Sequence, residues 1–327
     1  MRGGRGPCRG LAGALAAMLL ALAALPAGAE SKLINPCRFS SFDSPCQVRG
    51  GTYRALVPQG IGPHPALVYL YGSFGQSERI TGSGYFQRNV VRRGYALIAP
   101  SALEVEYRGG RTGTGWGRKA RRGHPRDDLA FLRRVLSDAR TRFNIDPDRL
   151  IFVGQSDGGF FIWEIACHHP RMAAAYAVHA ASYGWQLPER CDRPVHFLQG
   201  HGRRDRVVPF EGPIRQGPRL MAPPVAEAMR VMARTNGCRA EGRPGSSLRG
   251  FERLSWAGCR REASLDFLVH DGGHGWPRDW MPAVLDWFEE TRVRPAEAVT
   301  RRVGDRPGVF GTGGDAGLVK KAPGAED

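Results

Sequence analysis

The chain has 327 residues, which is longer than a typical domain but within the range that α/β folds reach as a single unit. Its formal net charge is +16, and nearly all of the positive charge is arginine, scattered along the chain and densest between Arg108 and Arg122, where it is interleaved with glycine. Nucleic-acid binding needs a basic face with aromatic or helical recognition elements, and none is evident, so we expect no nucleic-acid partner.

The N-terminus has the pattern of a secretory signal. Arg2, Arg5 and Arg9 precede an apolar stretch over residues 11–25, which small residues follow up to Ala29. A basic head, a short apolar core and a small-residue end predict a cleavable signal peptide over residues 1–29. The alternative, an uncleaved anchor, needs an apolar run of roughly 20 residues. We therefore expect a secreted or periplasmic protein with no stable membrane insertion after signal cleavage.

The cysteines agree with export. Cys8 would leave with the signal, and an even number then remains, as in a disulfide-bonded exported protein. Neighbouring pairs close the shortest loops, so we expect disulfides Cys37–Cys46, Cys167–Cys191 and Cys238–Cys259, although the sequence does not determine the connectivity. The alternative, a metal site, lacks a Cys-x-x-Cys motif or Cys/His ligand spacing, and we expect neither a metal nor a cofactor.

In the first half of the chain, short apolar runs alternate with turns and one helix. Residues 52–58 predict a strand and residues 60–65 a turn. The nearly continuous apolar runs at 66–71 and 96–100 are typical of strands buried on both faces of a parallel sheet. Apolar residues at helical spacing predict a helix over 127–143. A turn at 144–148 and a strand at 149–153 follow.

The second half continues the alternation. We expect helices over 159–168, 221–235 and 280–291, and strands over 173–179, 195–200 and 263–269. Strands alternating with helices predict an α/β fold with a mostly parallel central sheet and helices on both faces. The expected domain covers residues 30–293. The remaining segment, 294–327, is rich in Gly, Arg, Ala and Asp with little periodicity and is expected to be disordered.

The strongest motif, G-x-S-x-G, lies between the strand at 149–153 and the following helix. It runs from Gly154 to Gly158 with Ser156 at its centre. A serine hydroxyl is a weak nucleophile that must be exposed and deprotonated by a neighbour, and a sharp strand-to-helix turn lifts it above the sheet. The helix that follows directs its N-terminal N–H groups at developing negative charge. The motif therefore predicts Ser156 as the nucleophile of an α/β-hydrolase.

An acid and a base follow in the chain order that this fold uses, Ser, then Asp or Glu, then His. Asp205 lies in a loop after the strand at 195–200, and His274 lies in a glycine-rich loop after the strand at 263–269. Both loops fall at strand C-terminal ends, where α/β sheets gather their active sites. The alternatives are His201 or His270 as the base and Asp192 as the acid.

Two backbone N–H groups should form an oxyanion hole. One is expected from Asp157, the residue after the nucleophile, and the other from Ser73 or Phe74 in the loop after the strand at 66–71. The Asp157 carboxylate would oppose an oxyanion, so we expect it to point away and cap the helix. Three tryptophans are candidate walls of a substrate pocket, with plain core packing as the alternative: Trp116, Trp185 and Trp276.

Taken together, these segments resemble the secreted polyhydroxybutyrate depolymerase and feruloyl or acetylxylan esterase group of the α/β-hydrolases. The resemblance spans residues 50–290 and is carried by segments at 127–131, 145–150, 154–159, 205–209 and 273–277, with the Cys238 and Cys259 segments. Two features depart from that group. Tyr71-Gly72 stands where the group has His-Gly, and we expect the tail at 294–327 to be too short and structureless for the linker and polymer-binding domain of secreted depolymerases.

The resemblance implies a secreted carboxylic ester hydrolase that forms an acyl-enzyme through Ser156, His274 and Asp205. Without a polymer-binding domain, we expect a small or oligomeric ester as the substrate. One alternative is a serine peptidase of the prolyl-oligopeptidase type, whose loops around the acid and base look similar. A second is a catalytically inactive hydrolase-fold binding protein, which would be marked by a broken triad. The oligomeric state stays open.

Overall fold

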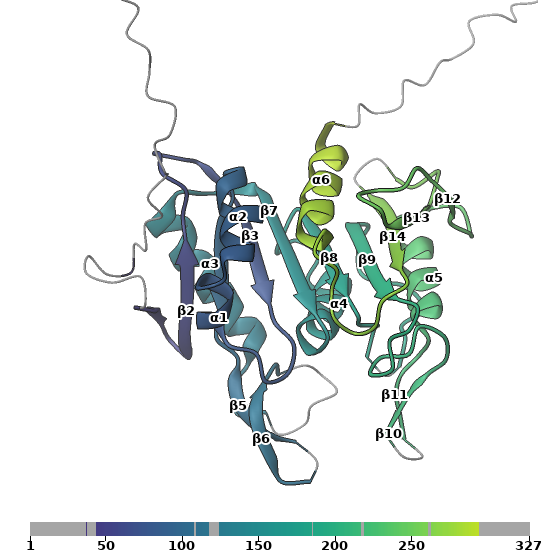
Figure 1. Ribbon diagram of the computed structural model, residues 1–327, viewed down its shortest axis with the longest axis horizontal. Helices are drawn as coiled ribbons and strands as arrows, with labels where there is room; N and C mark the ends of the chain where they lie inside the picture. The colour runs from purple at the N-terminus through teal and green to yellow at the C-terminus, as the bar shows by residue number, and fades with distance from the viewer. Residues whose placement is uncertain are drawn as a thin grey trace, which may run out of the picture.

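The computed structural model describes residues 37, 44–107, 109–117, 124–184, 186–216, 219–260 and 263–293 (Figure 1). The expected signal peptide at 1–29 and the expected disordered tail at 294–327 lie outside the described residues, as does Trp185.

A ten-stranded sheet runs through the molecule in the order β1-β2-β4-β3-β7-β8-β9-β14-β13-β12. Its six central strands, from β4 to β14, are parallel, and the two strands at each edge pair antiparallel. The prediction of a mostly parallel sheet is confirmed. In chain order the strands are β1 (Cys46–Val48), β2 (Gly51–Leu56), β3 (His64–Leu70), β4 (Ala96–Pro100), β7 (Ile145–Gln155), β8 (Ala175–His179), β9 (His196–Gly202), β12 (Arg243–Pro244), β13 (Glu252–Ser255) and β14 (Ser264–His270).

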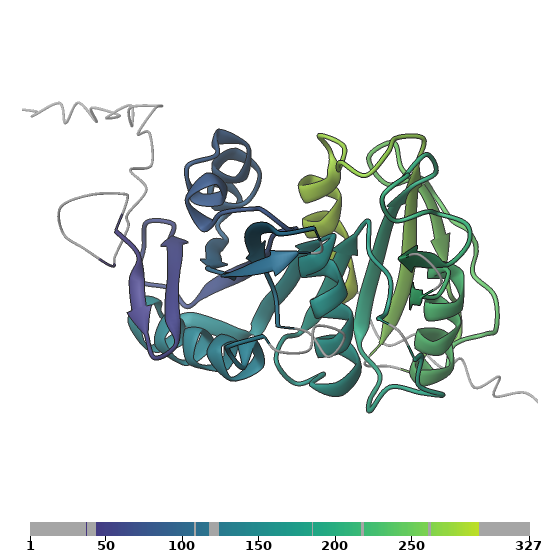
Figure 2. The same ribbon diagram turned by 90° about the horizontal axis from the view of Figure 1, so that it is seen from below.

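Helices cover both faces of the sheet, as expected (Figure 2). One face carries α3 (Asp128–Phe143), α4 (Asp157–His168) and α5 (Val225–Asn236). The other face carries α1 (Ser77–Thr81), α2 (Gly84–Asn89), the short 3-10 helix η1 (Val91–Arg93) and α6 (Trp280–Val293). Of the described helices, not one has the length and apolar character needed to cross a bilayer.

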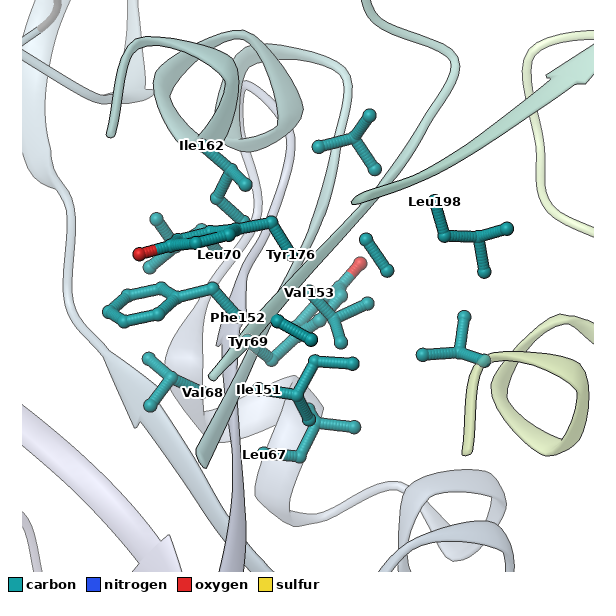
Figure 3. Close-up of a cluster of buried hydrophobic side chains, with 14 of the residues drawn as sticks. Leu67, Val68, Tyr69, Leu70, Ile151, Phe152, Val153, Ile162, Tyr176 and Leu198 are labelled. Carbon is teal, nitrogen blue, oxygen red and sulfur yellow. The ribbon is translucent and has the colours of Figure 1, made fainter. Parts of the chain in front are cut away.

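The core lies where the central strands meet these helices. Every residue of β3 is buried, and so are residues 150–154 of β7, which explains the continuous apolar runs in the sequence. Figure 3 shows side chains of both strands packed with Ile162 of α4 and Tyr176 of β8. Burying each large apolar side chain contributes about 1.5–3 kcal/mol. This packing fixes the positions of the carboxyl ends of β3 and β7 in the sheet.

The boundaries differ from expectation in one informative place. Residues 144–148 were expected to form a turn, whereas β7 already begins at Ile145. The reason is pairing across the sheet: the His64 N–H donates to the Asn144 carbonyl at 2.8 Å, and His64 is the register partner of Ile145. Two hairpins outside the main sheet were not foreseen: β5 (Leu103–Tyr107) with β6 (Arg111–Gly115), and β10 (Ile214–Gln216) with β11 (Arg219–Ala222).

All three expected cysteine pairs lie at disulfide distance. They are Cys37–Cys46, Cys167–Cys191 and Cys238–Cys259. The second pair joins the last turn of α4 to the segment that leads into β9. The third follows α5 and joins it to the segment before β14. The expectation drawn from the shortest loops is therefore confirmed.

Candidate active site

Ser156 occupies a strained turn between β7 and α4. β7 ends at Gln155 and α4 begins at Asp157, so Ser156 alone connects them. Its backbone has φ 50° and ψ −122°, a conformation that a residue with a side chain rarely adopts. Its N–H donates to the His179 carbonyl at 3.0 Å, and its carbonyl accepts from the Phe160 N–H at 2.9 Å. Ser156 is thereby held, partly exposed, at the carboxyl end of the sheet.

The glycines around Ser156 permit close backbone approaches. A Cβ on Gly158 would lie 2.1 Å from the Leu70 carbonyl oxygen, and a Cβ on Gly154 would lie 2.9 Å from the backbone of Gly158. A Cβ on Gly72 would lie 3.1 Å from the Cβ of Ser156. The ends of β3 and β7 and the start of α4 therefore meet at one point, which only glycine allows.

Asp205 and His274 are hydrogen-bonded at the same edge of the sheet. His274 Nδ1 lies 2.9 Å from Asp205 Oδ2, and Asp205 Oδ1 accepts from the N–H groups of Val207 and Val208, both at 2.9 Å. Burial alone would raise the pKa of Asp205, but the hydrogen bonds from His274 and from these two N–H groups outweigh it and hold that pKa below its usual value. Asp205 is thus an ionised partner that orients the His274 ring.

A further residue, which sequence reasoning missed, links the His274 loop to the turn. The side-chain amide of Gln155 donates to the His274 carbonyl at 3.1 Å. Because Gln155 directly precedes Ser156, this bond ties the loop after β14 to the end of β7. The first variable position of a G-x-S-x-G motif, which Gln155 occupies, carries no signal of such a contact in a single sequence.

The alternative acids and bases have other partners. His201 is fully buried, with Nε2 2.8 Å from the Val208 carbonyl and 3.5 Å from Asp205 Oδ2. His270 Nε2 lies 3.0 Å from His179 Nε2. Asp192 precedes β9, at the opposite end of the sheet. Of the candidates named from the sequence, His274 alone combines partial exposure with a hydrogen bond to Asp205.

The rings of His179 and His270 contact each other beneath the site, and their hydrogen bonds determine which nitrogen of each ring carries the proton. His270 Nδ1 accepts from the Gly272 N–H at 3.0 Å, so a neutral His270 ring carries its proton on Nε2 and donates it to His179. His179 then carries its own proton on Nδ1, a fully buried atom without a hydrogen-bond partner among the described residues. Burial, reinforced by the neighbouring His270, holds the pKa of His179 well below its usual value.

Burial also lowers the pKa values of His201 and His270. The rings beneath the site are therefore neutral in the folded protein near neutral pH. Within the part of the chain that the structure describes, no three His, Cys, Asp or Glu side chains gather as ligands for a metal ion.

The loop after β3 is tied to the unforeseen hairpin. The Phe74 N–H donates to the Thr114 carbonyl at 3.0 Å, and Thr114 Oγ1 donates to the Gly75 carbonyl at 2.6 Å. A Cβ on Gly113 would lie 2.1 Å from the Phe74 ring, so the ring rests directly on β6. Because the Phe74 N–H already has this partner, Phe74 is the less suitable of the two oxyanion donors expected in this loop. Ser73 is left as the candidate in this loop.

Trp116, just after β6, bridges the same loop to the start of α4. Its backbone N–H donates to Asp157 Oδ2 at 2.9 Å, and its indole N–H donates to the Tyr71 carbonyl at 2.8 Å. The Asp157 carboxylate is thus held by Trp116. The expectation that it caps the helix is wrong, because Ser156 occupies the N-cap position. The Trp116 side chain is fully buried and cannot form a pocket wall in this conformation.

Tyr71, which stands where the resembling esterase group has a histidine, is held by a hydrogen bond and by ring packing. Its hydroxyl accepts from the Ala102 N–H at 2.7 Å, and its ring lies 5.5 Å from that of Trp116. Burial raises the pKa of Tyr71 to about 12, so the hydroxyl stays protonated. The substitution leaves the loop firmly attached to the segment after β4.

Two aromatic side chains flank the site at the surface. Trp276, two residues after His274, is partly exposed and packs on Tyr69 and Phe86 with ring centres 5.2 Å and 5.7 Å away. Phe74 is 42% exposed and stacks on Tyr107 at 4.7 Å. Of the three tryptophans named from the sequence, Trp276 is the one that offers described surface beside His274.

We expect Gly158→Ala to destabilise the protein. The added methyl group would meet the Leu70 carbonyl at 2.1 Å, and such overpacking costs about 1–3 kcal/mol. Gly275→Ala is the matched control, because a Cβ there meets nothing within 4 Å. Thermal unfolding should show a clearly lower Tm for Gly158→Ala and an unchanged Tm for Gly275→Ala. Equal Tm values for the two variants would contradict the close approach.

The buried histidines predict a pH-dependent stability. Their folded-state pKa values are lowered, so the unfolded chain binds more protons below about pH 6.5. Stability should be full above that pH and should fall as the pH decreases below it. In His179→Gln the decrease of Tm between about pH 7 and pH 5 should be smaller than in the wild type. The partly exposed His168→Gln serves as control, and an equal decrease in all three proteins would refute the assignment.

Comparisons with known proteins agree with this geometry. No known family profile matches the chain. It is 26% identical over 251 residues to "Putative esterase NocK" of Nocardia uniformis subsp. tsuyamanensis, covering 69% of this chain and 68% of that protein. It is 26% identical over 153 residues to "Probable feruloyl esterase C" of Aspergillus niger, covering 45% of this chain and 50% of that protein. The chain thus spans half the length of that feruloyl esterase.

A shorter match and two solved structures complete the comparison. "Dipeptidyl-peptidase 5" of Porphyromonas gingivalis is 26% identical over 127 residues, 38% of this chain and 18% of that protein. The acetyl xylan esterase from Aspergillus awamori superposes with a TM-score of 0.54 at 15% identity, covering 73% of this chain and 94% of that one. A structure named "sOPH Native" gives 0.52 at 13% identity, covering 75% and 84%. By its fold and its relatives, the chain is an esterase-type α/β-hydrolase.

Proposed function

We propose that the protein is a carboxylic ester hydrolase that forms an acyl-enzyme on Ser156. The observation that carries the proposal is the 2.9 Å hydrogen bond between His274 Nδ1 and the ionised Asp205, at the edge where the strained turn presents Ser156. Its relatives named as esterases support the same chemistry.

In the first half of the reaction, Ser156 Oγ attacks the ester carbonyl carbon while its proton passes to His274 Nε2. Asp205 holds the ring by Nδ1 and stabilises the resulting imidazolium. When the bond to the alcohol oxygen breaks, the imidazolium donates its proton to that oxygen. In the second half, His274 takes a proton from water while the water oxygen attacks the acyl carbon. The bond from that carbon to Ser156 Oγ then breaks, and His274 returns the proton to Ser156 Oγ.

The oxyanion would be stabilised by the backbone N–H groups of Asp157 and Ser73. Asp157 is the first residue of α4, so its N–H has no partner within the helix. The hydrogen bonds of Thr114 and Trp116 support the correct spacing of the two donors, because they fix the loop after β3 and the start of α4 to one segment. Removal of one such donor typically lowers kcat by about 10²–10³-fold.

The substrate is a small or oligomeric ester in an exported setting. The three cysteine pairs at disulfide distance and the basic, then apolar N-terminus support secretion or a periplasmic location. Feruloyl and acetyl esters are the first candidates, on the names of the relatives, and 3-hydroxybutyryl esters follow from the resemblance to polyhydroxybutyrate depolymerases. Trp276 and Phe74 would contact the acyl or alcohol group. Trp116 would not contact the substrate, but its hydrogen bonds would hold the loop after β3 and the start of α4 in place.

A serine peptidase is the second candidate, favoured by the match to a dipeptidyl-peptidase. That match covers 18% of the peptidase, so it supports a shared hydrolase core and gives little support for peptidase activity. Cleavage of aminoacyl-proline amides in preference to esters would favour the peptidase.

Ser156→Ala should abolish ester hydrolysis. We expect p-nitrophenyl acetate turnover to fall by roughly 10⁶-fold or to the background rate, with an unchanged Tm. A fluorophosphonate should label the wild type stoichiometrically at Ser156, and a panel of feruloyl, acetyl and 3-hydroxybutyryl esters should then identify the acyl group. Normal esterase activity in Ser156→Ala would refute the proposal.

Trp116→Phe should lower kcat without changing KM. The variant keeps the aromatic packing but loses the indole hydrogen bond to the Tyr71 carbonyl, which loosens the Ser73 donor. Misplacing a catalytic group by about 1 Å lowers the rate by about 10²-fold. Trp163→Phe is the matched control, since its indole N–H donates to Gln199 in the core. Equal kcat values in the two variants would exclude this role of Trp116.

A further inference from the structure

Two adjoining hollows lie between α3 and the loop that joins α4 to β8. One has a volume of about 450 Å³ and the other about 440 Å³, and both are lined by Arg133, Arg171 and Met172. We call this pair of hollows the basic groove. Its loops lead into β8 and β9, so it faces the edge of the sheet where the parallel strands begin. Ser156 follows the opposite end of β7, and the basic groove is separate from the candidate active site.

The rim of the basic groove is cationic. The exposed residues Arg133 and Arg171 line both hollows, Arg193 lines one of them and Arg140 lines the other. Asp192 is the single carboxylate in the described lining, and it lies 3.5 Å from His168. The lining therefore has a strong excess of positive charge.

Few groups compensate the charge of these arginines. Arg133 Nη2 lies 3.4 Å from His169 Nδ1, which is not a carboxylate. Among the described residues, the side chains of Arg140, Arg171 and Arg193 have no ion-pair or hydrogen-bond partner. Cationic groups that converge on a hollow without counter-charges raise the local concentration of anions.

The frame of the basic groove is fixed in advance. The disulfide Cys167–Cys191 joins the end of α4 to the segment that carries Arg193, and the Asp192 N–H donates to the Cys167 carbonyl at 2.9 Å. The Met172 N–H donates to the His169 carbonyl at 3.1 Å. A ligand would therefore not have to order these loops.

The lining also indicates the kind of anion. The buried side chains of Met172 and Leu136 form an apolar floor beneath the arginines. Planar guanidinium groups bind carboxylates with two parallel hydrogen bonds, and an apolar floor suits the C–H face of a sugar ring. The described lining contains no Phe, Tyr or Trp on which a nucleic-acid base could stack. We propose that the basic groove binds an acidic polysaccharide, which would tether the protein to a polymer and leave Ser156 free.

The test compares two triple variants of the full-length protein that lose the same charge. One carries Arg140→Ser, Arg171→Ser and Arg193→Ser. The control carries Arg79→Ser, Arg88→Ser and Arg92→Ser, three exposed arginines of α1, α2 and η1 on the opposite face of the sheet. Binding to polygalacturonate, to neutral dextran and to duplex DNA is measured by calorimetry at low and at physiological salt.

We expect the groove variant to bind polygalacturonate at least about ten-fold more weakly than the wild type, through the loss of charge-assisted hydrogen bonds. The control should keep its affinity within about two-fold, since exposed charges beyond a Debye length are screened. Dextran should not bind, and p-nitrophenyl acetate hydrolysis should be equal in all three proteins. Three results would overturn the proposal: wild-type affinity in the groove variant, an equal loss in the control, or groove-dependent binding of DNA that is tighter than that of polygalacturonate.

Discussion

The architecture of the site depends on one backbone contact that leaves no room for a side chain. The start of α4 passes so close to the end of β3 that a Cβ on Gly158 would lie 2.1 Å from the Leu70 carbonyl. Because β3 and β7 are locked by their buried apolar side chains, neither strand end can move aside to relieve the contact. The chain must therefore turn within the single residue Ser156, at a positive φ of 50°. The loops of Asp205 and His274 are then placed relative to this turn by the parallel strands that precede them.

Much of this arrangement could be predicted from the sequence, because its main elements are encoded locally. The apolar runs of β3, β4 and β9 are readable since both faces of these strands are buried. The order of Ser156, Asp205 and His274 follows from the topology of the fold, in which parallel strands end at a common edge. The cysteine pairs could be predicted because sequence neighbours are also neighbours across short connections.

The parts that could not be predicted depend on contacts between distant segments. Apolar and charged residues alternate along β5, but its partner β6 is made of Arg, Thr and Gly and has no apolar alternation, so the sequence does not mark the two as a hairpin. Their effect on Phe74 and Tyr71 arises through hydrogen bonds across roughly forty residues of sequence. The same holds for Asp157, whose carboxylate was assigned by local rules to its own helix but bonds to Trp116. Local propensity contains no information on such pairings.

The edges of the ten-stranded sheet also affect how the protein behaves at high concentration. At one end, β12 has two residues, and one of them is Pro244, which has no N–H to offer a further strand. At the other end, β1 has three residues, and Cys46 links it to Cys37. An open sheet grows by adding strands from other molecules wherever a long edge is free. Edges this short offer few hydrogen bonds to an incoming strand, and this should disfavour edge-to-edge aggregation of the folded protein.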